Sequence, residues 1–350
     1  MPVAPRFSPR AIGIGAAIVT VLVWTAFIVI ARASAGRSLT PLDLAFARMS
    51  GATLVLAPWG AWLVLQARRA QRDEGGERGG TVAAPIGSLF GLSPLGLRVT
   101  ALAGATGGLG YAMLAYTGFF YAPAAHASVL MPGSLPLWTT LLAAVVLHDR
   151  ITPKRAAGLA LIVAGDLVVG GRSLLHAFEG GEIWKGDLLF MSAAFCWACY
   201  SVVVRRHGLD AVRATIAITL FAFLSFVPAY AVLAAAGWVT SHIGTAPWGE
   251  VAFQMAFQGI GSVVISGITF TRMIHYFGPV RSTMITALVP GLSAFGAVIF
   301  LGEPLHWSLL AGLLLVTAGI LFGVQRVRPI APDKAAPPAR VAGAAGGFDA

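Results

Sequence analysis

Charged residues are scarce in this chain. Among its 350 residues, 11% are Asp, Glu, Lys or Arg and 57% are hydrophobic, and the mean hydropathy is +0.81. Soluble domains usually carry about 25% charged residues, so this shortage excludes an ordinary water-soluble enzyme. Only the first few residues, segment 66–98 and the residues after Arg326 have the composition of a chain that faces water.

Cysteine and cofactor motifs are nearly absent as well. The two cysteines, Cys196 and Cys199, lie in an apolar stretch without the βαβ pattern of a redox motif, so we interpret them as small packing residues. None of the seven histidines has metal-ligand spacing, and no phosphate-binding or dinucleotide motif occurs in a strand–helix context. The sequence therefore predicts no cofactor and no metal.

Long apolar runs fill most of the sequence. A helix needs about 20 apolar residues to cross a bilayer, and the candidate spans are 11–31, 42–65, 99–121, 124–147, 156–171, 187–204, 215–238, 251–277, 282–301 and 307–324. Breaks after the third and eighth spans are placed at Ala122-Pro123 and Gly278-Pro279, because proline disfavours a continuing helix. The pattern predicts an all-α integral membrane fold with ten transmembrane helices.

Lysine and arginine set the predicted orientation. With the N terminus inside, 18 of the 24 basic residues fall in inner segments and four in outer loops. The outer four are Arg32, Arg37, Arg172 and Lys185, and Arg48 and Arg272 lie within spans. Cytoplasmic loops are enriched in Lys and Arg, so we expect a multi-pass protein of the cell (inner or plasma) membrane with both termini cytoplasmic. Topology also explains the net charge of +10 without nucleic acid.

Two segments outside the spans are polar. Segment 66–98 combines charges with glycines, and we expect a partly disordered inner loop near anionic headgroups. Residues 325–350 are rich in Ala, Pro and Gly, which predicts a disordered cytoplasmic tail.

The chain repeats itself. A shift of 154 residues aligns Pro136 with Pro290, Leu147 with Leu301, Asp149 with Glu303, Gly158 with Gly312 and Gly165 with Gly319. A shift of 173 residues aligns Trp24 with Trp197 and Arg32 with Arg205. Each half, 11–171 and 187–324, therefore holds five spans. An odd number of spans places the second half upside down, which is the inverted-repeat plan of many secondary transporters.

These features resemble the EamA-type members of the drug/metabolite transporter superfamily over roughly residues 11–324. The matching residues are Trp24 and Trp197, the stretch from Pro41 to Ala45-Phe46-Ala47-Arg48, Pro136 and Pro290, Gly302-Glu303, and the glycine pairs that follow. The resemblance implies ten helices as two inverted five-helix repeats, and export of a metabolite or amino-acid-like solute. His148-Asp149, the long loop at 66–98 and Asp166 depart from the family pattern.

Residues for a substrate cavity are sought among polar and aromatic side chains in the spans. Arg48 fits either a contact to a substrate carboxylate or a structural lock between helices. Arg272 and His275 share a face at an inner end, as an anion contact or an interfacial pair. Trp24 and Trp197 are expected near the cavity because symmetric positions converge on the midplane. Tyr111 and Tyr200 are further candidates for the cavity wall.

Acidic residues in or beside the spans suggest further roles. Asp166 is the only carboxylate well inside a span; it suits proton coupling, or else a pair with Arg172 near the outer end. Asp149 and Glu303 fall at turns, where we expect them to cap helix N termini. His126, at the outer mouth, is expected to be hydrated.

Other functions remain as alternatives. The favoured prediction is a transporter of a small organic solute in the bilayer, as a monomer or homodimer. An exchanger of organic anions, such as phosphorylated or nucleotide-linked sugars, is the second, because of Arg48 and Arg272. A membrane enzyme or a scaffold is disfavoured, since no protease-like constellation occurs in the spans and a scaffold needs no inverted repeat.

Overall fold

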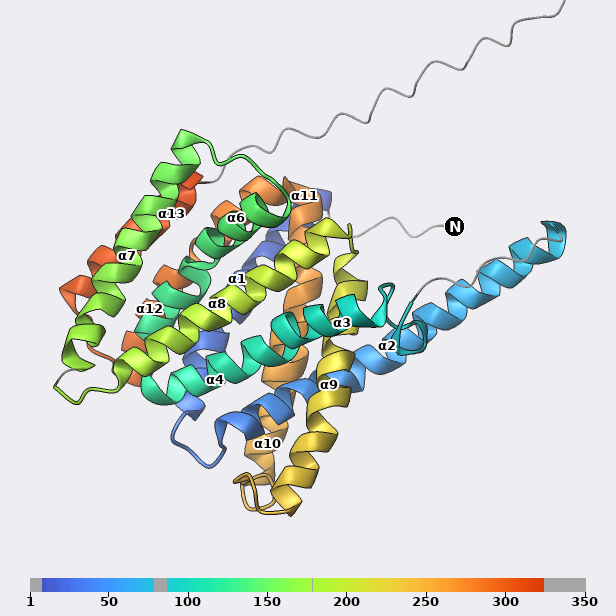
Figure 1. Cartoon of the computed structure of the whole chain (residues 1–350), viewed down its shortest axis with the longest axis horizontal. Coiled ribbons are helices and arrows are strands. Elements are labelled where there is room, and N and C mark those ends of the chain that lie inside the picture. The colour runs from blue at the N-terminus through green and yellow to red at the C-terminus, as the bar shows by residue number, and fades with distance from the viewer. Residues whose placement is uncertain (1–7, 79–86, 178, 324–350) are drawn as a thin grey trace, which may run out of the picture.

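The computed structural model describes residues 8–78, 87–177 and 179–323. Within these ranges the chain is helical, with one isolated β-bridge between Ser88 and Ser93. The helices form one bundle, from which the distal part of α2 projects (Figure 1). The chain is an all-helical membrane protein.

The first half of the chain contains seven α-helices and three short helices of other types. They are α1 (Pro9–Ser34), α2 (Pro41–Arg78), η1 (Leu89–Gly91), α3 (Leu97–Ala103), η2 (Gly104–Gly110), α4 (Tyr111–Tyr121), α5 (Ala124–Ser128), η3 (Val129–Gly133), α6 (Leu135–Val146) and α7 (Pro153–Ala177). The 3₁₀-helix is η1, and η2 and η3 are π-helical turns that join α-helices into longer segments.

The second half follows the same order of long helices, with no separate counterparts to η1, α5 and η3. It comprises α8 (Ile183–Arg206), α9 (Ala211–Ala235), α10 (Trp248–Gln254), η4 (Met255–Ile265), α11 (Ser266–Thr286), α12 (Val289–Leu301) and α13 (Trp307–Gly323). The π-helix η4 links α10 to α11.

Eight helices in the described ranges are long and apolar enough to cross a membrane. They cover Arg10–Ser34, Pro41–Arg69, Ala124–Val146, Pro153–Ala177, Ile183–Arg206, Ala211–Ala235, Trp248–Phe277 and Met284–Leu301. Helix α13 is apolar but shorter. The segment from α3 to α4 contains five glycines, which lower its mean hydropathy. The count of ten spans therefore stays a prediction.

Several predicted boundaries differ from the structure. Helix α2 continues to Arg78, so the expected loop at 66–98 begins later, and α7 runs to Ala177 instead of ending near Gly171. The break at Ala122-Pro123 is present, with Ala122 in an extended conformation. The break predicted at Gly278-Pro279 is wrong: α11 runs on to Thr286, and membrane helices tolerate proline where neighbours satisfy the freed carbonyl. The predicted tail, 325–350, lies outside the described residues.

Repeat-related glycines hold α7 against α13. A Cβ atom added to Gly158 would lie 2.7 Å from the carbonyl oxygen of Gly319, and one added to Gly165 would lie 2.8 Å from that of Gly312. Small residues let membrane helices approach this closely. Gly158 thus contacts the repeat equivalent of Gly165, and Gly165 contacts the repeat equivalent of Gly158. The two helices therefore cross in antiparallel directions.

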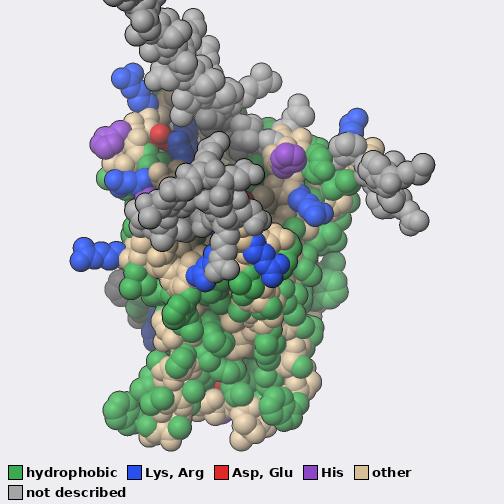
Figure 2. Space-filling model, turned by 90° about the vertical axis from the view of Figure 1, so that its right-hand side faces the viewer, with side chains coloured by type: hydrophobic (Ala, Val, Ile, Leu, Met, Phe, Trp, Pro, Cys, Tyr) green, Lys and Arg blue, Asp and Glu red, His purple; other side chains and the backbone are tan. Residues whose placement is uncertain are grey.

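The two halves also pack against each other away from this crossing, which lies at one edge of the bundle (Figure 1). Helix α1 packs against α11 and α12, while α8 packs against α4 and α6, and α2 packs against α9. Hydrophobic side chains cover much of one side of the bundle, and Lys and Arg gather toward one end (Figure 2). Exposed leucine, phenylalanine and tryptophan side chains over the rest of the surface suit a surface that faces lipid.

Candidate functional site

A large cavity of about 990 Å³ lies between the two halves. Its walls come from α1, α2, η2, α4, η3, α6 and α7 of the first half and from α8, α9, η4, α11 and α13 of the second. This volume is at the upper end of the range usual for small-molecule sites. The cavity is the candidate site.

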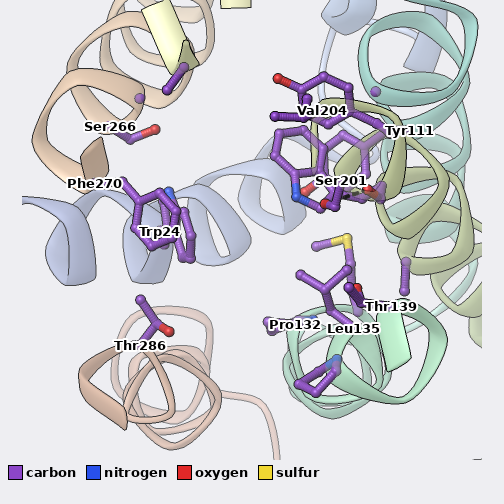
Figure 3. Close-up of a pocket in the computed structure, with 18 of the residues that line it drawn as sticks. Trp24, Tyr111, Pro132, Leu135, Thr139, Ser201, Val204, Ser266, Phe270 and Thr286 are labelled. Carbon is purple, nitrogen blue, oxygen red and sulfur yellow. Dashed lines mark hydrogen bonds between the residues drawn. The ribbon is translucent and has the colours of Figure 1, made fainter. Parts of the chain in front are cut away.

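Aromatic side chains form two opposing walls. The rings of Trp24 and Phe270 pack 5.1 Å apart on one side. On the other, the ring of Trp197 packs 4.9 Å from Tyr111 and 5.3 Å from Tyr200. Figure 3 shows Trp24 and Phe270 facing the Tyr111 side across an open centre. A flat or apolar group fits between walls of this kind.

Arg48 brings the positive charge into this space. Its Nη1 donates to Ser262 Oγ at 3.1 Å and to the carbonyl of Gln258 at 3.4 Å. Its Cζ lies 5.4 Å from the Phe27 ring and 6.0 Å from the Tyr111 ring, within cation–π range. None of the ion pairs between described side chains involves Arg48. Within the described part of the chain, the contacts of the guanidinium are thus with neutral groups.

The position of Arg48 depends on the π-helix η4. An added Cβ at Gly51 would lie 2.1 Å from the Met255 carbonyl oxygen, so only glycine allows α2 to pack this closely on η4. A π-helical turn disrupts the regular hydrogen-bond ladder and is frequent at functional sites. The Gln258 carbonyl in this turn accepts from Arg48, and the buried Gln258 side chain accepts from Tyr116 at 3.1 Å.

Five of the predicted cavity residues line this one cavity: Trp24, Arg48, Tyr111, Trp197 and Tyr200. Arg272 does not line it; its side chain is exposed on α11. Asp166 is buried in α7, outside the lining. Whether any of these residues binds a substrate stays a prediction.

Sequence reasoning missed one wall of the cavity. Ser262, Ser266 and Phe270 line it at successive four-residue intervals on η4 and α11. Residues four apart share a helix face, so this spacing was the available signal. These three residues form a polar and aromatic stripe on the helix. Arg272 follows Phe270 by two residues and therefore lies on a different face.

One end of the cavity, which we call the Asp149 end, reaches the bundle surface. Asp149, Arg150, Arg155 and Arg205 are among its lining residues there. Arg205 Nη1 lies 2.6 Å from Asp149 Oδ2, with the two side chains 53% and 26% exposed. Arg155 donates to Thr140 at 2.8 Å. The expected helix cap by Asp149 is replaced by this ion pair.

The opposite end, which we call the Glu303 end, is closed by a tighter network. Arg32 Nε lies 3.2 Å from Glu303 Oε1, and Arg32 Nη1 donates to the Phe119 carbonyl at 2.5 Å. Glu303 also accepts from the backbone N–H groups of Ala124 at 3.0 Å and Ala125 at 3.1 Å. Glu303 thus caps a helix as expected, but the helix is α5 rather than α13. None of these five residues lines the cavity.

A helical membrane bundle with an internal cavity open at one end is the architecture of a small-molecule carrier. The family comparison agrees, since the EamA-like transporter family matches residues 11–171 and 184–324. The chain belongs to this family.

Three relatives are similar over most of their length. The uncharacterized transporter YyaM of Bacillus subtilis (strain 168) is 26% identical over 64% of this chain and 72% of its own. A probable amino-acid metabolite efflux pump of Salmonella typhimurium (strain LT2) is 27% identical over 59% and 69%. A probable terminal-alkyne amino-acid exporter of Streptantibioticus cattleyicolor is 28% identical over 68% and 79%.

One solved crystal structure is similar in fold. It covers 91% of this chain and 98% of its own, with a TM-score of 0.52 and 23% sequence identity. The likeness supports the arrangement of helices and carries no information on substrate.

Proposed function

We propose that the protein is a secondary transporter that exports an amino-acid-like or other small organic solute by alternating access. The observation that carries the proposal is a cavity shared by both halves, open at the Asp149 end and closed at the Glu303 end. Two of the relatives described above are named for amino-acid efflux or export. A carrier that exports must present such a cavity to the cytoplasm, which is the side that the basic residues assign to the Asp149 end.

The proposal includes ten spans arranged as two inverted repeats, 11–171 and 187–324. Three pairs of contacts support it. The Gly158–Gly319 approach mirrors Gly165–Gly312, α1 on α12 mirrors α8 on α6, and the Arg32–Glu303 pair mirrors Arg205–Asp149. Inverted repeats supply alternating access because the two halves exchange conformations about a shared site.

The chemistry of the cavity suggests the substrate class. Arg48 offers one positive charge beside the aromatic walls, which suits a single carboxylate attached to an apolar or aromatic group. A phosphorylated or nucleotide-linked sugar carries more negative charge, and the other cavity arginines (Arg150, Arg155 and Arg205) lie at the mouth. We therefore favour the amino-acid-like class over the organic-anion exchanger.

Counterflow in proteoliposomes tests this function. Vesicles containing the purified protein and preloaded with L-phenylalanine should take up labelled L-phenylalanine, and phenylacetate should compete because it keeps the carboxylate and ring. Trp248 provides a control variant, since its side chain is exposed and outside the cavity lining. Trp248→Ala should keep the exchange. Absence of exchange with each member of an amino-acid panel would contradict the proposal.

A further inference from the structure

A row of buried residues on α7 links the cavity to the Glu303 end. Leu159 and Ile162 line the cavity, and Asp166, Gly170 and Ser173 continue the same face at intervals of four, four and three residues. All five residues are buried, whereas Val163 and Leu167 on the other face are exposed. Residues at this spacing form one stripe along a helix.

The end of the stripe away from the cavity carries a hydrogen-bonded network. The Ser173 hydroxyl donates to Asp187 Oδ2, and His126 Nδ1 lies 2.8 Å from Asp187 Oδ1. An added Cβ at Gly170 would lie 3.8 Å from Asp187 Oδ2, so the Asp187 carboxylate reaches over Gly170. The His126 side chain, 21% exposed, is the most accessible of the three, which corrects the expectation of a simple hydrated histidine.

Asp166 lies seven residues before Ser173, about 10 Å along α7, and finds no hydrogen-bond partner among the described groups. Its residue is 7% exposed, and neither carboxylate oxygen has a hydrogen-bond partner within the described part of the chain. Because α7 extends to Ala177, Asp166 lies near the middle of its helix and not near the outer end. The Arg172 side chain, its expected partner, lies outside the described residues.

Among the described side chains, the elements packed against α7 place no cation beside Asp166. Helices α13, α6 and η3 carry no ionisable side chain. Helix α8 contributes Lys185 and Asp187 toward the Glu303 end, and Cys196, Cys199, Tyr200, Arg205 and Arg206 toward the other. Helix α7 itself carries Lys154, Arg155 and His176 near its ends. An ionised carboxylate without a partner is costly inside a membrane, so burial of this kind favours the neutral form of the Asp166 carboxyl group.

We propose that Asp166 is the proton-binding site of the transporter and that His126, Asp187 and Ser173 form its entry path from the Glu303 end. A proton passes from His126 and Asp187 to the Asp166 carboxylate, where an O–H bond forms, and leaves through the cavity at the Asp149 end. One proton then enters the cell as one solute leaves, with no redox step. Gly170, over which the Asp187 carboxylate reaches, lies one helical turn or about 6 Å along the axis from Asp166, and water carries the proton across the remaining space between the two carboxyl groups.

The coupling role rests on the proposed function, but proton binding is measured without any solute. Infrared difference spectra of the purified protein between neutral and alkaline pH report the carbonyl stretch of protonated carboxyl groups. The wild type should show such a band, and Asp166→Asn should lose it. Glu179→Gln, an exposed carboxylate beyond the end of α7, is the matched control and should leave the band unchanged. In Asp187→Asn the band should persist but exchange more slowly with deuterium. A band that survives Asp166→Asn overturns the assignment.

Transport measurements separate coupling from exchange. In vesicles with a lumen one pH unit more acidic than the medium, the wild type should accumulate labelled L-phenylalanine about tenfold, the ratio that one proton per neutral solute supports. Asp166→Asn should lose this accumulation but keep counterflow, and Asp166→Glu should restore part of it. If the wild type shows counterflow without accumulation, the proton inference fails and the proposed function stands. If counterflow itself is absent, the proposed function fails and the infrared result alone decides whether Asp166 binds the proton.

Discussion

Arg32 and Glu303 at one end of the bundle correspond, through the internal repeat, to Arg205 and Asp149 at the other. At the Glu303 end the side chains are 31% and 11% exposed, and the carboxylate also binds two backbone N–H groups of α5. At the Asp149 end the Arg205 and Asp149 side chains are more exposed, at 53% and 26%, and line the open mouth. An arginine–carboxylate pair therefore closes one end, and the equivalent pair lies at the open end.

The difference lies in what else the carboxylate can bind. Ala124 and Ala125 supply two N–H donors to Glu303. The repeat places Gly278 and Pro279 at the equivalent positions for Asp149, and proline has no N–H to donate. If the Asp149 end closed in the same way as the Glu303 end, Asp149 would have one backbone N–H donor fewer, because Pro279 replaces Ala125. This asymmetry favours the conformation that is closed at the Glu303 end.

The largest effects are expected where a hydrogen bond to a charged group is lost, and the first such change is Glu303→Gln. The amide keeps an acceptor for α5 but loses the charge that pairs with Arg32, and a lost hydrogen bond to a charged group costs about 1.5–3 kcal/mol. The fraction of molecules that are open at the Glu303 end should therefore rise on the order of tenfold or more. The measurement uses a Cys196→Ala, Cys199→Ala background with the cavity reporter Ser201→Cys, labelled from outside in intact cells by an impermeant maleimide.

Arg32→Gln should give the same increase in labelling, because it removes the other member of the pair. Arg37→Gln is the matched control, since Arg37 is exposed in the adjacent loop. Equal labelling in Glu303→Gln and wild type would mean that the ion pair does not hold this end closed. Labelling of the wild-type reporter from outside alone would reverse the proposed orientation.

The second prediction concerns Arg48, which lies between the two ends. A substrate contact needs the planar guanidinium, so Arg48→Lys should raise the apparent substrate constant about ten- to a hundredfold. Melting curves in detergent should stay close to those of the wild type. The opposite result, lower stability in Arg48→Ala with normal transport in Arg48→Lys, would assign Arg48 the structural role left open by the sequence.

The third prediction tests whether both halves contribute equally to the site. Trp24→Ala and Trp197→Ala each remove one partner of an aromatic pair, worth about 0.5–1.5 kcal/mol beyond area burial. Each should weaken solute affinity by about two- to tenfold or more, with the amount of folded protein less affected. Normal activity per folded molecule in both variants would identify the tryptophans as packing residues.

Patterns that repeat along the chain were the ones that sequence could predict. Apolar runs gave the helices, and the shift that aligns Asp149 with Glu303 identified the two carboxylates that pair with arginines at opposite ends. Trp24, Arg48 and Trp197 were found because polar and symmetric aromatic residues stand out in an apolar span. The open and closed ends could not be predicted, since both conformations of a carrier satisfy one sequence.

Other features depended on packing that sequence does not encode locally. The contact between His126 and Asp187 joins residues 61 positions apart, and only the fold of α5 onto α8 brings them together. The depth of Asp166 was misjudged because Arg172 and Ser173 suggested an earlier end for α7 than Ala177. The continuation of α11 through Gly278-Pro279 likewise depends on neighbouring helices rather than on proline's own preference.

The smallest effect is expected at the Asp149 end. Asp149→Asn removes an exposed ion pair, and exposed pairs contribute only about 0.2–1 kcal/mol. In the conformation described here the cavity is already open at this end, so labelling of the Ser201→Cys reporter from inside, in inverted vesicles, should change by less than about fivefold. The pair should matter more when this end closes, because Asp149 then loses water. Asp149→Asn should therefore slow the conformational change that closes this end. It should lower the rate of net export more than it lowers labelling of the reporter. A change in labelling as large as that of Glu303→Gln would show that the two ends are equally tight and would remove the asymmetry attributed to Pro279.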